Sequence, residues 1–391
     1  LTSCLSLRND RSEVEKISSN ANTYVVDLDE KGVGMNGFGS ADIFSSIRVI
    51  PLENHSESLF GELTSMQIYD GNLVILDAHK SKSLFVFDRE GKFLRRIGRT
   101  GAGPGEYLKP IDFTIDKMND EIFVLDAAQF INVYNVRTGL YKRTLSIREP
   151  GTVVRYIQME NGTLYSDRYV FEPSHSDPLL QSIDVETGHC KALYLNAAKY
   201  NCGWNELYAT QYGFFSGRST SSPVFFQVFM NTIIKMDGGK LFPYVVLKSR
   251  DLTTNKDLQD VDLNSLNEYL FSNKKVYNIQ AYFENDSIIL FSYNRGNSNQ
   301  SVVINKLTEE IKLGQVSNNL LYKSKARWTL PIDFVAFDES GGYLYVDDIF
   351  KPYLRQAIAD GVIHPSVSFN DAALAALADD SNSLILHYIN R

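Results

Sequence analysis

Short runs of apolar residues recur along this chain, and each is bounded by Gly, Asn or Asp. In the clearest example, residues 73–97, two apolar runs end at Asp77 and Asp88, a Glu-Gly turn follows, and a third run completes the unit. Short runs rich in Val, Ile, Leu and Phe between such turn signals predict β-strands. The unit therefore predicts a small antiparallel sheet.

The same unit occurs again downstream, so internal repetition organises the sequence. A second copy covers residues 111–147 and a third covers residues 153–195. Asp77, Asp126 and Asp167 end the equivalent strand in the three copies and lie 49 and 41 residues apart. Spacings of about 40–50 residues are typical of the blades of β-propellers.

Three weaker copies follow, at residues 225–248, 277–313 and 334–389. We therefore predict an all-β fold, a six-bladed β-propeller with four-stranded antiparallel blades. The last copy is one strand short, and residues 44–52, ahead of the first copy, alternate as a strand does. Pairing this N-terminal strand with the last blade closes the ring and covers two sheet edges that would otherwise promote aggregation.

Two segments interrupt the strand pattern with helical spacing. Residues 258–271 carry Leu and Val at helical intervals after Asp257, which is a suitable capping residue. Residues 371–378 read DAALAALA and fall between strands of the last blade. Both segments are predicted to be small helical insertions that pack on one face of the propeller.

A glycine-rich loop, GRTGAGPGEY at residues 98–107, follows the first copy. Gly101, Gly103 and Gly105 tolerate backbone conformations that strain other residues, and the proline within the loop restricts the residue before it. Such a loop can cradle a phosphate group when a helix begins directly after it. Here Pro110 and another strand follow, so the sequence favours a structural connection between two blades.

A family resemblance rests on these same segments. The run IGRTGAGPGEYLKPIDFTID, followed by EIFVLDAAQFINVYN, resembles NHL-type repeats. With SSIRVIPLEN before the first copy, SLFVFDREGKFL within it and a helix before the fifth, the pattern is similar to six-bladed propeller lipoproteins of gut Bacteroides-type bacteria. The resemblance covers residues 23–391 and implies one propeller domain there. It supplies no catalytic residues, because that family is largely without assigned biochemistry.

Composition narrows the choice of partner. The 22 Tyr and 23 Phe favour half-buried strands over helices. With 39 Lys and Arg against 47 Asp and Glu, the net charge of −8 works against nucleic acid as a partner. Cys190 and Cys202 are compatible with a disulfide or with two free thiols, and their spacing does not suggest zinc. We expect a monomer.

The first residues suggest an envelope protein. Leu1, Thr2, Ser3 and Cys4 resemble the end of a bacterial lipobox, which predicts a lipid anchor on Cys4. Residues 1–22 would then form a polar tether, because they are rich in Ser, Asn and charged residues. No later apolar run approaches the roughly 20 residues that cross a bilayer. We expect an exported protein that contacts the outer membrane only through this lipid.

Candidate ligand-binding residues gather in loops on one face. Because strands within a blade are antiparallel, the loop after the second strand and the connection to the next blade leave the sheet at the same end. The polar and aromatic residues predicted there are His79, Arg99, Glu106, Tyr107, Gln129 and Arg295, with Trp204 and Trp328 in nearby connections. Each also has a structural interpretation: the tryptophans would pack between blades, and Glu106 would bind the amides of its own loop.

The leading hypothesis is a non-catalytic, envelope-anchored propeller that binds a glycan, a peptide or an envelope protein on the loop face. The alternative is a hydrolase or lyase with a site at the mouth of the central channel, with Ca²⁺ as a candidate cofactor. The six histidines show no zinc-binding pattern, and no GxSxG motif is present. Neither observation identifies the ligand.

Overall fold

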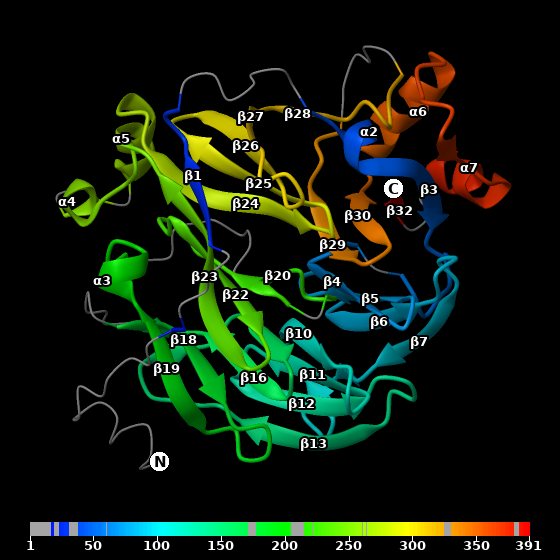
Figure 1. Ribbon diagram of the computed structural model, residues 1–391. Coiled ribbons are helices and arrows are strands. Elements are labelled where there is room, and N and C mark those ends of the chain that lie inside the picture. Colours follow the sequence, from blue (N-terminus) through cyan, green and yellow to red (C-terminus); the bar gives the residue numbers. More distant parts are fainter. Residues whose placement is uncertain are drawn as a thin grey trace. The chain divides into compact units, whose positions relative to one another are not determined.

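The structure is a computed structural model that describes residues 17–18, 23–30, 38–59, 61–170, 177–204, 215–220, 222–259, 261–262, 264–323, 330–378 and 383–391. Six small antiparallel sheets form a six-bladed β-propeller, as the sequence predicts (Figure 1). Few helices accompany them.

In each of the first three blades, four strands lie side by side in chain order. Blade one contains β4 (Ser65–Tyr69), β5 (Asn72–Asp77), β6 (Ser83–Phe87) and β7 (Phe93–Ile97). Blade two contains β10 (Pro110–Asp116), β11 (Glu121–Asp126), β12 (Phe130–Asn135) and β13 (Tyr141–Ser146). Blade three contains β15 (Ile157–Glu160), β16 (Thr163–Asp167), β18 (Pro178–Ile183) and β19 (Cys190–Asn196).

The later blades are less regular. Blade four contains β20 (Phe215–Ser216), β21 (Val224–Phe225), β22 (Thr232–Asp237) and β23 (Lys240–Lys248). Blade five contains β24 (Val276–Glu284), β25 (Ile288–Arg295), β26 (Ser298–Asn305) and β27 (Ile311–Gly314). Blade six contains β29 (Phe334–Asp338), β30 (Gly341–Val346), β32 (Leu384–Asn390) and β3 (Phe44–Pro51).

The remaining elements are short. The two-residue strands are β2 (Phe38–Gly39), β8 (Arg99–Thr100), β9 (Glu106–Tyr107), β14 (Thr152–Val153), β17 (Tyr169–Val170), β28 (Val316–Ser317) and β31 (Val367–Ser368), and β1 spans Tyr24–Asp27. The helices are α2 (Ser40–Ile43), α3 (Ala197–Tyr200), α4 (Asn255–Leu258), α5 (Leu266–Ser272), α6 (Lys351–Ala359) and α7 (Asp371–Ala378).

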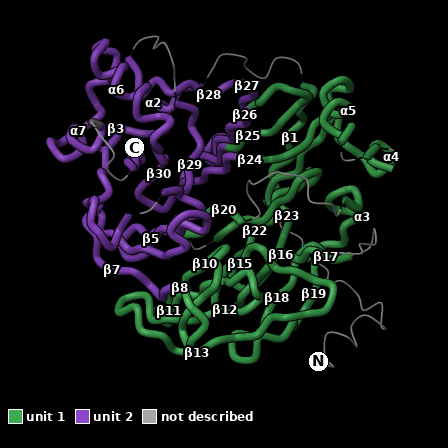
Figure 2. Tube along the Cα trace, turned by 180° about the vertical axis from the view of Figure 1, so that it is seen from behind, with its two compact units in different colours: residues 1–32, 101–280, 291–300 green, residues 33–100, 281–290, 301–391 purple. Residues whose placement is uncertain are grey.

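The chain divides into two compact units, coloured separately in Figure 2. Unit 1 comprises residues 1–32, 101–280 and 291–300 and holds blades two, three and four. Unit 2 comprises residues 33–100, 281–290 and 301–391 and holds blades one and six. The strands of blade five are shared between the two ranges.

The predicted closing strand is confirmed within unit 2. Strand β3 pairs antiparallel with β32, from Phe44 opposite Asn390 to Pro51 opposite Leu384. The N-terminal segment thus supplies the outer strand of the last blade. A parallel strand, β31, pairs with the other side of β3 at Ile47 and Arg48. Blade six therefore has five strands, and β31 covers the middle of the outer edge of β3.

An additional N-terminal strand was not predicted. Strand β1 pairs parallel with β23 and extends blade four to five strands. The ring of Tyr24 lies edge-on to that of Tyr244, with centroids 5.7 Å apart. Upstream, the amide of Ser18 donates to the carbonyl oxygen of Leu241 at 2.8 Å. A run of four strand residues is too short to be recognised by periodicity alone.

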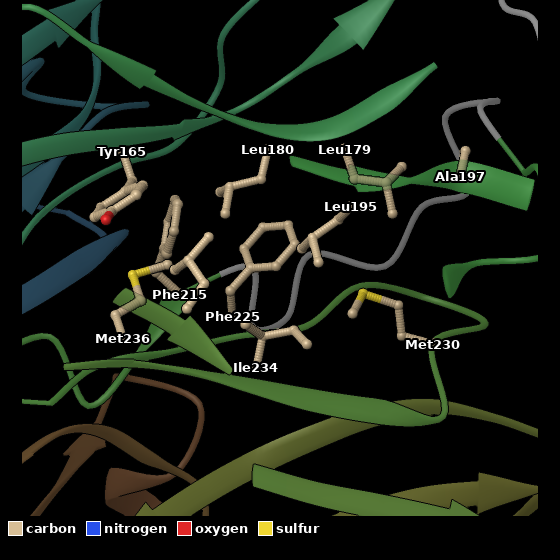
Figure 3. Close-up of a cluster of buried hydrophobic side chains, with 11 residues drawn as sticks. Tyr165, Leu179, Leu180, Leu195, Ala197, Phe215, Phe225, Met230, Ile234 and Met236 are labelled. Atoms are coloured by element: carbon tan, nitrogen blue, oxygen red, sulfur yellow. The ribbon is translucent and has the colours of Figure 1, made fainter. Parts of the chain in front are cut away.

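The hydrophobic cores lie between neighbouring sheets. In unit 1, Leu180 of blade three lies above Phe225 and Ile234 of blade four, and Met230 and Met236 fill the sides of the cluster (Figure 3). All five side chains are buried. These contacts explain why even the irregular fourth blade keeps apolar residues at alternating positions.

The helix predicted at residues 258–271 is wrong in extent, because two helices, α4 and α5, occupy this region. Thr254 caps α4, with the Asp257 carboxylate accepting from the Thr254 amide at 2.8 Å, so Asp257 belongs to the first turn. The carboxylate of Asp262 then accepts from the amides of Asn264 and Ser265, which forms a turn just before α5. Helix α7 matches the prediction, whereas α6 was missed.

Candidate functional site

The glycine-rich loop is fixed by its own glutamate. Glu106 Oε2 accepts a hydrogen bond from the amide of Gly103 at 2.8 Å. A Cβ atom at Gly101 would lie 2.0 Å from the same oxygen, so a larger residue there would displace this carboxylate from its position. An amide that a phosphate group would need is therefore already occupied, as the structural interpretation of Glu106 requires.

Blade two holds the rest of this loop. The amide nitrogen of the Asn132 side chain donates to the carbonyl oxygen of Glu106 at 2.9 Å, and the Tyr134 hydroxyl donates to that of Gly105 at 3.0 Å. The side chain of Tyr107 is buried. The Tyr134 hydroxyl is also largely buried, which raises the pKa of Tyr134 well above its ordinary value. Glu106 and Tyr107 thus anchor the connection between blades.

The repeated aspartates at strand ends bind backbone amides. The Asp126 carboxylate accepts from the amides of Leu108 and Lys109 at 2.6 and 3.0 Å. The Asp77 carboxylate is buried, which opposes its ionisation, but amides of Gly61, Ser81 and Lys80 lower its pKa below the ordinary value. Each aspartate holds an incoming loop against its own blade.

Gln129 joins the loops of blades two and three in unit 1. Its side chain makes two hydrogen bonds to the backbone of Val154, donating to the carbonyl oxygen at 2.9 Å and accepting from the amide at 2.8 Å. Its φ of 64° places the backbone in the left-handed region, which bends the loop toward blade three. Gln129, predicted as a ligand contact, therefore fixes the spacing between two loops.

Two arginine–aromatic pairs flank this junction. The guanidinium of Arg148 lies 4.2 Å from the ring centroid of Phe130, and its Nε donates to the carbonyl oxygen of Ala128 at 3.0 Å. The guanidinium of Arg155 lies 5.2 Å from the ring of Tyr169, and its Nε donates to Asp167 at 2.9 Å. The Arg155 guanidinium is therefore held by a buried carboxylate, whereas Arg148 lies at the surface with one backbone hydrogen bond and its ring contact.

We call Gln129, Phe130, Arg148, Arg155 and Tyr169 the loop-face cluster. Arg148 is exposed, and the other four are half-buried. Rigid guanidinium groups bind carboxylates and planar polar groups, and partly exposed aromatic rings supply apolar contact area. This combination can bind a glycan, a peptide or a protein surface. Arg148, Phe130, Arg155 and Tyr169 were absent from the predicted contacts, because their pairing depends on loops from two blades.

The other predicted residues lie elsewhere. In unit 1, Arg295 forms an ion pair with Asp29 at 2.7 Å, and Trp204 packs edge-on against Phe229 with ring centroids 5.3 Å apart. In unit 2, His79 and Arg99 are exposed. Trp328 and Cys4 lie outside the residues that the structure describes.

A serine–histidine pair in unit 2 bears on the enzyme alternative. Ser340 Oγ lies 3.0 Å from His387 Nε2 and donates to Asp338 at 2.6 Å. A serine hydroxyl has one hydrogen, so His387 Nε2 must be the donor in the first contact. A catalytic relay needs the carboxylate on the other imidazole nitrogen, where it orients the base. This arrangement does not activate Ser340 as a nucleophile.

Cys190 and Cys202 are free thiols in unit 1. The Cys202 thiol donates to the carbonyl oxygen of Thr253 at 3.1 Å, and burial raises its pKa to about 12. Within the described residues, no three His, Cys, Asp or Glu side chains are arranged to hold a metal ion. None of the helices in the described part of the chain is long and apolar enough to cross a bilayer.

Comparison with known proteins supports the fold. The model of a family described as Domain of unknown function (DUF4934) matches residues 23–352. The crystal structure of a protein described as exported, from Bacteroides fragilis NCTC 9343, is 16% identical with a TM-score of 0.65 and covers 95% of this chain and 99% of its own. A DUF4221 family member from Bacteroides vulgatus is 13% identical with a TM-score of 0.50 and covers 88% and 96%. No curated protein matches the chain.

Proposed function

The chain belongs to the family described as Domain of unknown function (DUF4934), and from its loop geometry we propose a non-catalytic binding protein of the cell envelope. Its partner is a carbohydrate, a peptide or an envelope protein, bound on the loop-face cluster. The repeats would be of the NHL-like type, and a lipid on Cys4 would attach the protein to the outer membrane. The fold resemblance to a Bacteroides fragilis protein described as exported supports this location.

The observation that carries the proposal is the fixed arginine–aromatic surface. Asp167, which is fully buried, binds Arg155 and the amide of Tyr156 at 2.8 Å. A second ion pair, between Arg168 and Glu149 at 2.7 Å, joins the same two segments of the chain. Because these partners fix the backbone and one guanidinium in advance, little side-chain entropy is lost when a ligand binds.

We expect Arg148→Ala and Tyr169→Ala each to weaken binding by about tenfold, since central arginine and tyrosine contacts are common hot spots. The measurement is a glycan and peptide array on the full chain, followed by titration with the ligands found. Arg137→Ala is the matched control, because Arg137 is an exposed arginine in the turn at the opposite end of the blade-two sheet. If the arrays give no ligand, or if both variants bind normally, the proposal is wrong.

The location is tested separately. We expect mass spectrometry of protein extracted from membranes of the native host to show Cys4 as an acylated N-terminal residue. Cys4→Ser should move the protein from the membrane fraction to the soluble fraction and leave its folded stability unchanged. An unmodified Cys4 in membrane-extracted protein would contradict the anchor and would leave the binding surface unaffected.

A further inference from the structure

The arginines in and next to the loop-face cluster differ in how their charges are neutralised. Arg155 donates to the carboxylate of Asp167 at 2.9 Å, and that carboxylate is fully buried. Arg168 forms an ion pair with Glu149 at 2.7 Å. Among the residues that the structure describes, no carboxylate lies within ion-pairing distance of Arg148. The positive charge of Arg148 is therefore available to an anionic group of a ligand.

The exposed side chain of Arg148 is nevertheless held at a defined place. Its Nε donates to the carbonyl oxygen of Ala128 at 3.0 Å, and its guanidinium lies 4.2 Å from the ring centroid of Phe130. Ala128 and Phe130 flank Gln129, whose side chain is bonded twice to the backbone of Val154. The guanidinium and the ring thus belong to one hydrogen-bonded unit. The two Nη groups can bind a carboxylate end-on, through two parallel hydrogen bonds.

The cluster offers mainly hydrogen-bond donors. A guanidinium group donates and does not accept. The amide side chain of the cluster, that of Gln129, already uses its oxygen to accept from the amide of Val154 at 2.8 Å. A peptide backbone presents N–H groups that need acceptors, whereas the carboxylate, ring and hydroxyl oxygens of an acidic sugar accept from donors of this kind. The balance of donors and acceptors therefore favours an acidic glycan over a peptide.

Phe130 and Tyr169 supply apolar surface to the same unit, and both are half-buried. Tyr169 lies opposite Val153 in the pairing of β14 with β17, and Val153 directly precedes Val154, so Tyr169 is joined to the unit through the backbone. A pyranose ring presents CH groups on its face, and a uronic acid carries its carboxylate directly on that ring. One rigid ligand can therefore contact an aromatic side chain and bind Arg148 at a low entropy cost. A glutamate side chain holds its carboxylate on a flexible chain and has no such face.

We propose that the loop-face cluster binds a glycan that contains uronic acid residues, with one carboxylate bound end-on by Arg148 and a sugar ring packed against the aromatic side chains. This inference rests on the binding role proposed above and narrows the ligand to an acidic carbohydrate. The net charge of the chain is −8, so an anionic glycan has no general attraction to this protein. Its recognition depends on the local charge of Arg148.

The test titrates the full chain with a galacturonate trimer. One control is the methyl ester of the same trimer, which keeps the sugar rings and removes the charges. The other is a triglutamate peptide with blocked ends, which keeps the carboxylates and lacks the rings. We expect the acid trimer to bind at least about tenfold more tightly than either control, because only the acid trimer combines charge-assisted hydrogen bonds with a ring face. Equal binding of the trimer and its ester, or tighter binding of triglutamate, would overturn the proposal.

Two variants assign the carboxylate to Arg148. Arg148→Gln should weaken the acid trimer about tenfold and leave the weaker binding of the methyl ester unchanged, since only the charged contact is lost. Arg148→Lys keeps the charge without the paired donors and should weaken the trimer by only about threefold. Arg137→Gln, at the exposed arginine of the β12–β13 turn, is the matched control and should bind normally. No loss in Arg148→Gln, or an equal loss for trimer and ester, would contradict the assignment.

Failure of this inference is separable from failure of the proposed function. If a neutral glycan or a peptide binds the cluster and the acid trimer does not, the acidic ligand is wrong and the binding role stands. If neither the arrays nor the trimer give any binding, the binding role itself is wrong.

Discussion

Replacing Arg218 by alanine is expected to lower the free energy of unfolding by about 3–5 kcal/mol, because it leaves a buried carboxylate without its counter-ion. Arg218 makes two hydrogen bonds to the Asp112 carboxylate, at 2.8 and 3.1 Å. It also donates to the carbonyl oxygens of Phe113 and Ile157. Asp112 is only 1% exposed, so water cannot replace the lost partner.

Chemical denaturation followed by intrinsic fluorescence measures this loss. The double variant Arg218→Met with Asp112→Leu should recover most of it, since replacing both members of a buried pair by apolar residues removes the unpaired charge. Arg250→Ala is the matched control, because the Arg250 side chain is 82% exposed. This variant should lower the free energy of unfolding by less than about 1 kcal/mol. A loss below about 1 kcal/mol in Arg218→Ala would show that Asp112 is not buried as described.

The second large effect is a loss of stability in mild acid that depends on His387. Burial, together with the nearby positive charge of Arg48, lowers the pKa of His387 to about 4. In the unfolded chain this pKa is about 6.5, so the unfolded state binds the proton first. The contribution of neutral His387 to the free energy of unfolding is therefore fully present above pH 6.5 and is lost as the pH falls toward 4. A shift of this size corresponds to about 3 kcal/mol.

The experiment compares the free energy of unfolding of the unaltered protein and of His387→Gln between pH 7 and pH 4. The variant should lose less stability over this range, although it starts lower because the ring stacks on Tyr343 at 4.2 Å. Burial raises the pKa of Glu160, which acts in the opposite direction, but that contribution cancels in the difference. His79→Gln, at an exposed histidine, should follow the unaltered protein. Identical pH slopes for His387→Gln and the unaltered protein would contradict the prediction.

The fold could be predicted because each repeat shows the same local order of strands and turns in the sequence. Strand-ending aspartates such as Asp77 and Asp126 recur at blade spacing, and each binds backbone amides in the structure. Strand β1 and helix α6 were missed. Strand β1 is only four residues long, which is too short to show a periodic pattern. Helix α6 gives few sequence signals: a proline in its first turn and buried apolar residues at Leu354 and Ala357.

The binding surfaces could be predicted only in part. Gln129 lies in one of the loops named from the sequence, but its side chain is hydrogen-bonded to the backbone of Val154. The exposed cation near this loop is Arg148, which lies over the ring of Phe130. The pairing of Arg155 with Tyr169 also involves residues of a loop that does not repeat along the chain.

The closing strand also constrains the order in which the protein can fold. Ser45 and Ile389 are 344 positions apart, yet the serine hydroxyl donates to the isoleucine carbonyl oxygen. Strand β3 precedes blade one in the chain and stays unpaired during synthesis until β32, its partner, has followed. Contacts of such high sequence separation form late and slowly, and they leave an apolar strand open to other chains in the meantime. Completion of blade six is thus expected to be the slow step of folding, and C-terminal truncation before β32 should expose β3 to aggregation.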